Sequence, residues 1–265
     1  GLAAKKHKLA ARIIGVTAHK DSLRKALRRK AIDSGTLDLK KSVINSDMVV
    51  LATPVDKVIS TLKELSHSLK KGCIVIDVAS VKQGIVDKAE RIIGRRGVFV
   101  GTHPMAGSEQ RGVEKADVNL FKGAVCILTK TGKTDKKALA AVSDFWKKLG
   151  AKIYILSPAE HDKEISNVSH LPHAVAYALS AAVRPLSVRF AATGLKDTTR
   201  IASSDPDLWA SILVENRRNV GNDIKIYLKE LKRIGNEIAC GRKDHLRKLL
   251  RGAKEKRDKL ISNER

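Results

Sequence analysis

Aromatic residues are scarce in this sequence: Phe, Tyr and Trp together make up 3% of its 265 residues. Proteins that bind single-stranded nucleic acid stack its bases on such side chains, so surfaces for base stacking would be scarce here. The sequence also contains no helix-turn-helix, zinc-finger or RNP-type motif. Nucleic acid is therefore not the partner we expect.

Long hydrophobic runs are also missing. No segment approaches the roughly 18 consecutive apolar residues that a membrane-spanning helix needs. The first residues, Gly1 to Lys6, lack the apolar core and cleavage site of a signal peptide. We therefore expect a cytoplasmic protein that does not attach to membranes.

Cysteine is rare, and the three present, Cys73, Cys126 and Cys240, lie far apart in the sequence. This spacing forms neither a metal-binding pair nor a disulfide framework. We expect three reduced thiols that pack as small core residues, and no metal site.

Acidic residues are too few to balance the basic ones, which leaves a net charge of +24. The excess is concentrated at the two ends. Residues 1–41 carry 12 Lys and Arg against 3 Asp and Glu, and residues 225–265 carry 14 against 6. Solvated helix faces that attract anionic ligands explain this pattern better than a nucleic-acid surface, although a basic nucleic-acid-binding module remains an alternative.

The first 156 residues alternate short apolar runs with amphipathic segments. The runs predict strands, and the segments Val58–Leu69 and Lys136–Leu149 predict crossover helices. This alternation predicts a Rossmann-like, doubly wound parallel α/β sheet. The expected strands are Arg12–Val16, Met48–Ala52, Cys73–Ala79, Gly97–Thr102, Ala124–Thr129 and Lys152–Leu156.

From Glu160 onward helical periodicity replaces the strands. Asp205-Pro206 predicts a capped helix start, and apolar residues then recur every three or four positions as far as Ile238. So long an apolar stripe suggests burial against a second subunit. We predict a nucleotide-binding domain over residues 1–156, and an all-α substrate and homodimerisation domain over residues 157–265.

A glycine-rich phosphate loop is absent. A dinucleotide-binding fold normally opens with a strand and a Gly-x-Gly-x-x-Gly turn that leads into the first helix. Here residues 1–6 already have the pattern of that helix. We expect a strand and the loop to lie upstream, with a natural protein that lacks the loop as the alternative.

An ordered set of motifs resembles the prephenate/arogenate dehydrogenases of tyrosine biosynthesis. Any one of these segments is weakly specific, but together they extend over essentially the whole chain. They are Leu51-Ala52-Thr53-Pro54-Val55, Asp77-Val78-Ala79-Ser80-Val81-Lys82, Gly101-Thr102-His103-Pro104-Met105-Ala106-Gly107, Val168-Ser169-His170-Leu171-Pro172-His173, Asp197-Thr198-Thr199-Arg200-Ile201-Ala202 and Ser204-Asp205-Pro206-Asp207-Leu208-Trp209.

The resemblance implies an oxidoreductase that converts prephenate to 4-hydroxyphenylpyruvate, or arogenate to tyrosine, with loss of CO2 and hydride transfer to NAD or NADP. It assigns His103 as the base on the ring hydroxyl, a role that suits an imidazole near neutral pH. It assigns Ser80 to a hydrogen bond with His103. The small-molecule dicarboxylate would be bound by Ser169, His173, Asp197 and Arg200.

Taken alone, each of these residues has a plainer interpretation. His103 could cap a strand end, Ser80 could cap a helix, and Arg200 could pair with Asp197 or Asp205. Lys82 could contact an anion or be a solvated first-turn residue. His170 and His173 could share a helix face as a zinc pair, but no third ligand follows at a recognisable spacing.

Cofactor contacts are expected after two of the strands. By resemblance, Thr53, Pro54 and Val55 lie beside the nicotinamide ribose, with Ser80 nearby. The strand that ends at Val16 is followed by Thr17-Ala18-His19-Lys20, without the acid that hydrogen-bonds the NAD ribose. The missing acid and the two basic residues, His19 and Lys20, favour NADP modestly over NAD, and Thr17 and His19 are the contacts expected at this ribose.

Other two-domain NAD(P)-dependent hydroxyacid dehydrogenases are the nearest alternative. They place a catalytic lysine in the helical domain, where this sequence has Ser169-His170-Leu171-Pro172-His173.

Overall fold

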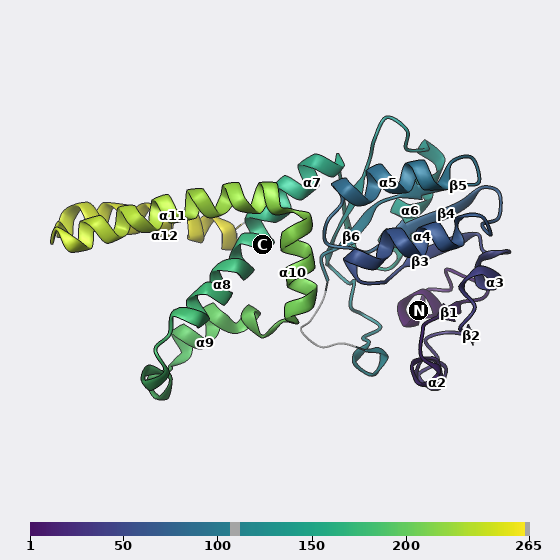
Figure 1. Cartoon of the computed structure of the whole chain (residues 1–265), viewed down its shortest axis with the longest axis horizontal. Helices are drawn as coiled ribbons and strands as arrows, with labels where there is room; N and C mark the ends of the chain where they lie inside the picture. Colours follow the sequence, from purple (N-terminus) through teal and green to yellow (C-terminus); the bar gives the residue numbers. More distant parts are fainter. Residues whose placement is uncertain (107–111, 263–265) are drawn as a thin grey trace. The chain divides into compact units, whose positions relative to one another are not determined.

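The computed structural model describes residues 1–106 and 112–262 (Figure 1). Gly107, the last residue of the His103 motif, lies outside this range. The strands are β1 (Ile14–Val16), β2 (Ser34–Thr36), β3 (Met48–Leu51), β4 (Cys73–Asp77), β5 (Gly97–Val100), β6 (Thr102–Pro104), β7 (Val125–Thr129) and β8 (Lys152–Leu156). The helices between them are α1 (Leu2–Lys6), α2 (Lys20–Arg28), α3 (Leu39–Val43), α4 (Val58–Ser66), α5 (Gln83–Ile93) and α6 (Lys136–Lys148).

Most of the strands pair in parallel. β1 pairs with β2, β4 lies between β3 and β5, and β7 pairs with β8, all in parallel. The exception is β6, which is antiparallel to β7 and places His103 opposite Ile127. The predicted Rossmann-like fold is confirmed.

Two apolar clusters cover opposite faces of the strands. One gathers Val75 and Phe99 with the apolar sides of α4 and α5, which lie side by side. The other gathers the alternate strand residues Ile76 and Val100 with α6. Because successive strand residues point to opposite faces, helices on both sides bury both sets.

Two short strands were not predicted. The strand predicted over Gly97–Thr102 ends at Val100, and the chain then enters β6. His103 therefore lies inside a strand rather than after one. β2 has the sequence Ser-Gly-Thr. These three residues contain no run of β-branched or aromatic side chains, which is the pattern that predicts a strand.

After β8 the described residues form helices joined by short loops. They are α7 (Pro158–Ile165), a π-helical turn (Ser166–His170), α8 (Leu171–Ala182), α9 (Thr193–Thr199), α10 (Pro206–Glu215), α11 (Arg217–Ala239) and α12 (Lys243–Ser262). Short 3₁₀ turns occupy Val55–Lys57, Val113–Lys115, Pro185–Phe190 and Arg200–Ser203. In the described part of the chain no strand follows Leu156, as predicted.

The helix starts follow from local sequence. Asp205 accepts a hydrogen bond from the Leu208 amide at 2.8 Å, which confirms the predicted cap of α10. Ser157 and Glu160 form a reciprocal capping box around Pro158, and this fixes where α7 begins.

Residues Gly1–Arg217 and Arg218–Arg265 form two compact units. The predicted domain boundary at residue 156 lies within the first unit and stays a prediction. No helix among the described residues is long and apolar enough to cross a membrane.

The second unit exposes many apolar side chains. Ile226, Leu228, Leu231 and Ile238 on α11 and Leu250 on α12 are each at least half exposed. Cys240 is exposed as well, so the expectation that every cysteine packs in a core is wrong for it, whereas Cys73 and Cys126 are buried.

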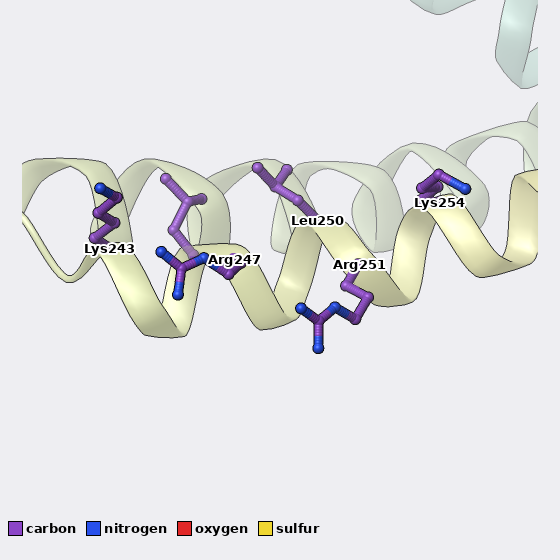
Figure 2. Close-up of a pocket in the computed structure, with 6 residues that line it drawn as sticks. Lys243, Arg247, Leu250, Arg251 and Lys254 are labelled. Atoms are coloured by element: carbon purple, nitrogen blue, oxygen red, sulfur yellow. The ribbon is translucent and has the colours of Figure 1, made fainter.

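Side chains of α12 line an open groove of about 550 Å³ (Figure 2). Four of them are cationic and two are leucines: Lys243, Arg247, Arg251, Lys254, Leu246 and Leu250. None of these residues belongs to the motifs that predict the active site.

Candidate active site

A buried ion pair lies at the carboxyl end of β4. Lys82 and Asp77 are both fully buried, and the Lys82 ammonium donates to the Asp77 carboxylate. Asp77 also accepts hydrogen bonds from the amides of Ala79, at 3.1 Å, and Thr102, at 3.2 Å. The interpretation of Lys82 as a solvated residue is therefore wrong.

His103 lies next to this pair and is 8% exposed. Its Nδ1 is 2.9 Å from Nε2 of His161, a fully buried residue on α7. Nδ1 of His161 is in turn 2.8 Å from Oδ1 of Asp162. We call this arrangement the Asp162–His161–His103 chain.

Backbone amides hold the far end of the chain. The Asp162 carboxylate accepts from the amides of Lys82, at 2.7 Å, and Gln83, at 2.9 Å, at the start of α5. Lys82 is thus fixed through its amide by Asp162 and through its ammonium by Asp77. These contacts join α5 and α7 behind the imidazole of His103.

Burial keeps these imidazoles neutral. It lowers the pKa of His103 well below the usual 6.5, and the nearby His161, Lys82 and His170 add to the effect. Burial also lowers the pKa of His161, although its hydrogen bond to Asp162 opposes this. A neutral His103 can accept a proton throughout the neutral pH range.

The motif Ser169-His170-Leu171-Pro172-His173 begins in the π-helical turn and continues into α8. His170 is fully buried, with Nδ1 3.0 Å from the Asn216 amide, and burial lowers its pKa to about 4. His173 is half-buried and stacks on Trp209 with ring centroids 3.4 Å apart. Its Nδ1 donates a hydrogen bond to the Ser169 carbonyl at 2.9 Å. Trp209 itself is buried in the apolar core.

The remaining predicted residues lie in different surroundings. Ser80 is half-buried in the loop between β4 and α5, and because α5 begins at Gln83 it does not cap that helix. Arg200 is exposed at the end of α9, and its charge lowers the pKa of His173, after the larger effect of burial. Asp197, on α9, is also exposed.

The predicted cofactor residues follow β1 and β3. Thr17 is half-buried and its hydroxyl accepts from the amide of His19, which is the exposed N-cap of α2. Thr53 follows β3, and its buried hydroxyl oxygen has no hydrogen-bond partner among residues 1–106 and 112–262. An unsatisfied buried hydroxyl at a carboxyl strand edge fits a polar ligand such as a nicotinamide cofactor.

No group of three His, Cys, Asp or Glu side chains in the described ranges is placed to hold a metal ion. His170 forms its hydrogen bond with Asn216 and His173 with Ser169, so neither shows the geometry of a zinc pair.

Comparison with known proteins decides the family. Residues 1–155 match the family model described as "Prephenate dehydrogenase, nucleotide-binding domain", and residues 157–252 match "Prephenate dehydrogenase, dimerization domain". The chain belongs to the prephenate dehydrogenase family. Its members include prephenate, cyclohexadienyl and arogenate dehydrogenases, which are oxidoreductases of tyrosine biosynthesis.

Three relatives match nearly the whole of this chain. Prephenate dehydrogenase of Bacillus subtilis is 37% identical over 98% of this chain and 72% of its own. A crystal structure of prephenate dehydrogenase from A. aeolicus, in complex with hydroxyphenyl propionate and NAD+, has a TM-score of 0.91 and 37% identity, and the match covers 98% of this chain and 92% of that one. Synechocystis arogenate dehydrogenase has a TM-score of 0.83 and 31% identity, with coverage of 98% and 95%.

His161 and Asp162 were missed by the sequence analysis. The sequence pattern that could mark them as functional is weak, because an adjacent His and Asp in the first turns of a helix are usually solvated. Only the fold brings α7 against α5 and β6, and so places this pair behind a histidine 58 residues earlier in the chain.

Proposed function

We propose that this protein catalyses the oxidative decarboxylation of prephenate to 4-hydroxyphenylpyruvate, or of arogenate to tyrosine, with hydride transfer to NAD or NADP. The observation that carries the proposal is the buried, neutral His103, in a chain whose two halves match the two domains of the family. Incubation of the purified protein with each substrate and each nicotinamide should reduce the cofactor in at least one combination. No reduction in any of the four would contradict the proposal.

His103 would act as the base. Its free ring nitrogen takes the proton of the substrate's C4 hydroxyl while the hydride on C4 leaves, and a C4 carbonyl forms. The bond from C1 to the ring carboxylate then breaks, CO2 departs, and the electron pair enters the ring. The proton on His103 returns to the oxygen, so the aromatic product is a phenol and no net proton is lost. The bound nicotinamide would supply the hydride acceptor.

The other predicted site residues would bind and orient the substrate. Ser80 would hydrogen-bond the substrate hydroxyl beside Nε2 of His103, since Nδ1 of His103 is already bonded to His161, and Ser169 and His173 would line the substrate pocket. Arg200, together with Asp197, would act at a substrate carboxylate. A guanidinium can clamp a carboxylate through two parallel charge-assisted bonds.

Replacement of Arg200 by Gln should raise KM for the substrate about 10- to 100-fold, because charge-assisted hydrogen bonds to a carboxylate are lost. Steady-state kinetics with saturating cofactor measure this change. The matched control is Arg184→Gln, at another exposed arginine of the same unit. An Arg200→Gln enzyme with unchanged KM would remove this residue from the carboxylate site.

We also propose that Thr17 and His19 contact the adenosine ribose, that Thr53, Pro54, Val55 and Ser80 contact the nicotinamide side, and that NADP is preferred. No acidic residue occupies the position after β1 where it would repel a 2′-phosphate.

A Thr17→Asp variant should lower the ratio of kcat/KM for NADP to that for NAD by about 10-fold or more, because a carboxylate repels the phosphate and accepts from the ribose hydroxyl. Thr17→Ser is the control and should leave the ratio unchanged. If Thr17→Asp leaves the ratio of kcat/KM for NADP to that for NAD unchanged, the adenosine ribose does not lie beside Thr17.

The exposed apolar side chains of α11 and α12 support a homodimer formed through the helical domain, in line with the family description of residues 157–252. We place the enzyme in the cytoplasm. The absence of a spanning helix among the described residues is consistent with this location.

A further inference from the structure

The chemistry proposed for His103 requires one particular tautomer. A base that faces the substrate through Nε2 must carry its own proton on Nδ1. In a neutral imidazole either nitrogen can hold the proton, and the partner of the other nitrogen decides which one does. The partner of Nδ1 in His103 is His161, so the protonation of His161 determines the reactivity of His103.

The carboxylate of Asp162 determines the protonation of His161. It already accepts from the amides of Lys82 and Gln83, and a carboxylate can only accept. Nδ1 of His161, 2.8 Å away, must therefore be a donor. Because burial lowers the pKa of His161, this imidazole carries a single proton, which leaves Nε2 as an acceptor for His103.

We infer that Asp162 and His161 are positioning residues that hold His103 with its proton on Nδ1 and share the positive charge that forms when Nε2 takes the substrate proton. This inference rests on the proposed function. Each hydrogen bond of the chain has the same direction: His103 Nδ1 donates to His161 Nε2, and His161 Nδ1 donates to the Asp162 carboxylate. Nε2 of His103, the nitrogen that reacts, is left as an acceptor. Protonation of His103 Nε2 would strengthen the bond from His103 Nδ1 to His161, and the charge would be offset at Asp162.

Among the residues that the structure describes, the other charged or titratable groups around His103 do not fulfil this task. Lys82 is a buried cation held by Asp77, and it disfavours a charged His103. His170 has the same effect on His103. Asp162 therefore supplies the negative charge at the far end of the chain, with Asp77 already paired.

Two variants separate the two roles, which are to hold the His103 proton on Nδ1 and to offset the positive charge that forms on His103. His161→Phe removes the acceptor for Nδ1, so the His103 proton should redistribute toward Nε2 and kcat should fall about 100-fold. Asp162→Asn keeps an oxygen acceptor but removes the negative charge, so kcat should fall about 10-fold and the acid limb of the kcat/KM profile should move to lower pH. Glu164→Gln, an exposed change on the same helix, is the control and should alter neither.

Nitrogen-15 NMR of the histidine rings in the protein without ligands tests the inference independently of turnover. The expected result is that His103 carries its proton on Nδ1 in the wild type, and that His161→Phe shifts it toward Nε2. A His103 protonated on Nε2 in the wild type, or unaffected by His161→Phe, would overturn the inference even if the enzyme is active. Absence of turnover in the wild type would instead count against the proposed function.

Discussion

Replacement of His103 by Asn should lower kcat by about 100- to 10,000-fold, because a positioned general base contributes a factor of that size. Cofactor binding should be retained, since the residues proposed to contact the cofactor follow β1, β3 and β4 rather than β6. Steady-state kinetics give kcat, and titration of the protein's fluorescence with the cofactor gives Kd.

The matched control is His67→Asn, at an exposed histidine after α4, which should leave kcat unchanged. An active His103→Asn enzyme would assign the base to another residue. Equal losses in both variants would point to a general effect on folding.

The low pKa of His103 has a consequence for the wild type. The folded-state pKa lies well below 6.5, so the free enzyme keeps this base unprotonated through neutral pH. The acid limb of kcat/KM should therefore appear only below pH 6.5.

Replacement of Lys82 by Met should destabilise the protein by about 3–5 kcal/mol. The lost ammonium would leave the Asp77 carboxylate buried and without its cation, and uncompensated buried charges are costly. Two backbone amides would still donate to Asp77, but they do not offset its charge. Urea-induced unfolding, followed by circular dichroism, measures the change in the free energy of unfolding.

Lys88→Met is the control for this effect, because Lys88 lies exposed on the same helix. It should change the free energy of unfolding by less than about 0.5 kcal/mol. Removal of both charges, in Lys82→Met with Asp77→Leu, should recover part of the loss. A Lys82→Met variant as stable as the wild type would show that the pair contributes little to stability.

Much of the fold could be predicted because its signals are local. Nearly continuous apolar runs such as Met48–Leu51 are typical of parallel strands buried on both faces, and Asp205-Pro206 marks a helix start by capping alone. β6 could not be predicted in this way. Its three residues include a proline, and it is held as a strand by pairing with β7, which lies more than 20 residues later.

The site was predictable where chemistry and sequence motif coincide. His103 stands in a motif that can be read from the sequence, whereas Lys82 looks like an ordinary first-turn lysine. Its complete burial depends on the ion pair with Asp77 and on the hydrogen bond that its backbone amide donates to Asp162, 80 residues later. His161 is missed for the same reason, since only tertiary packing turns a helical His-Asp pair into a support for the base.

The most direct test of the central claim is to measure reduced nicotinamide and released CO2 in the same reaction, with prephenate or arogenate as the substrate. The two should form in equimolar amounts, together with an aromatic product. Reduction of the cofactor without CO2 release would contradict the account and would indicate a simple hydroxyacid dehydrogenase.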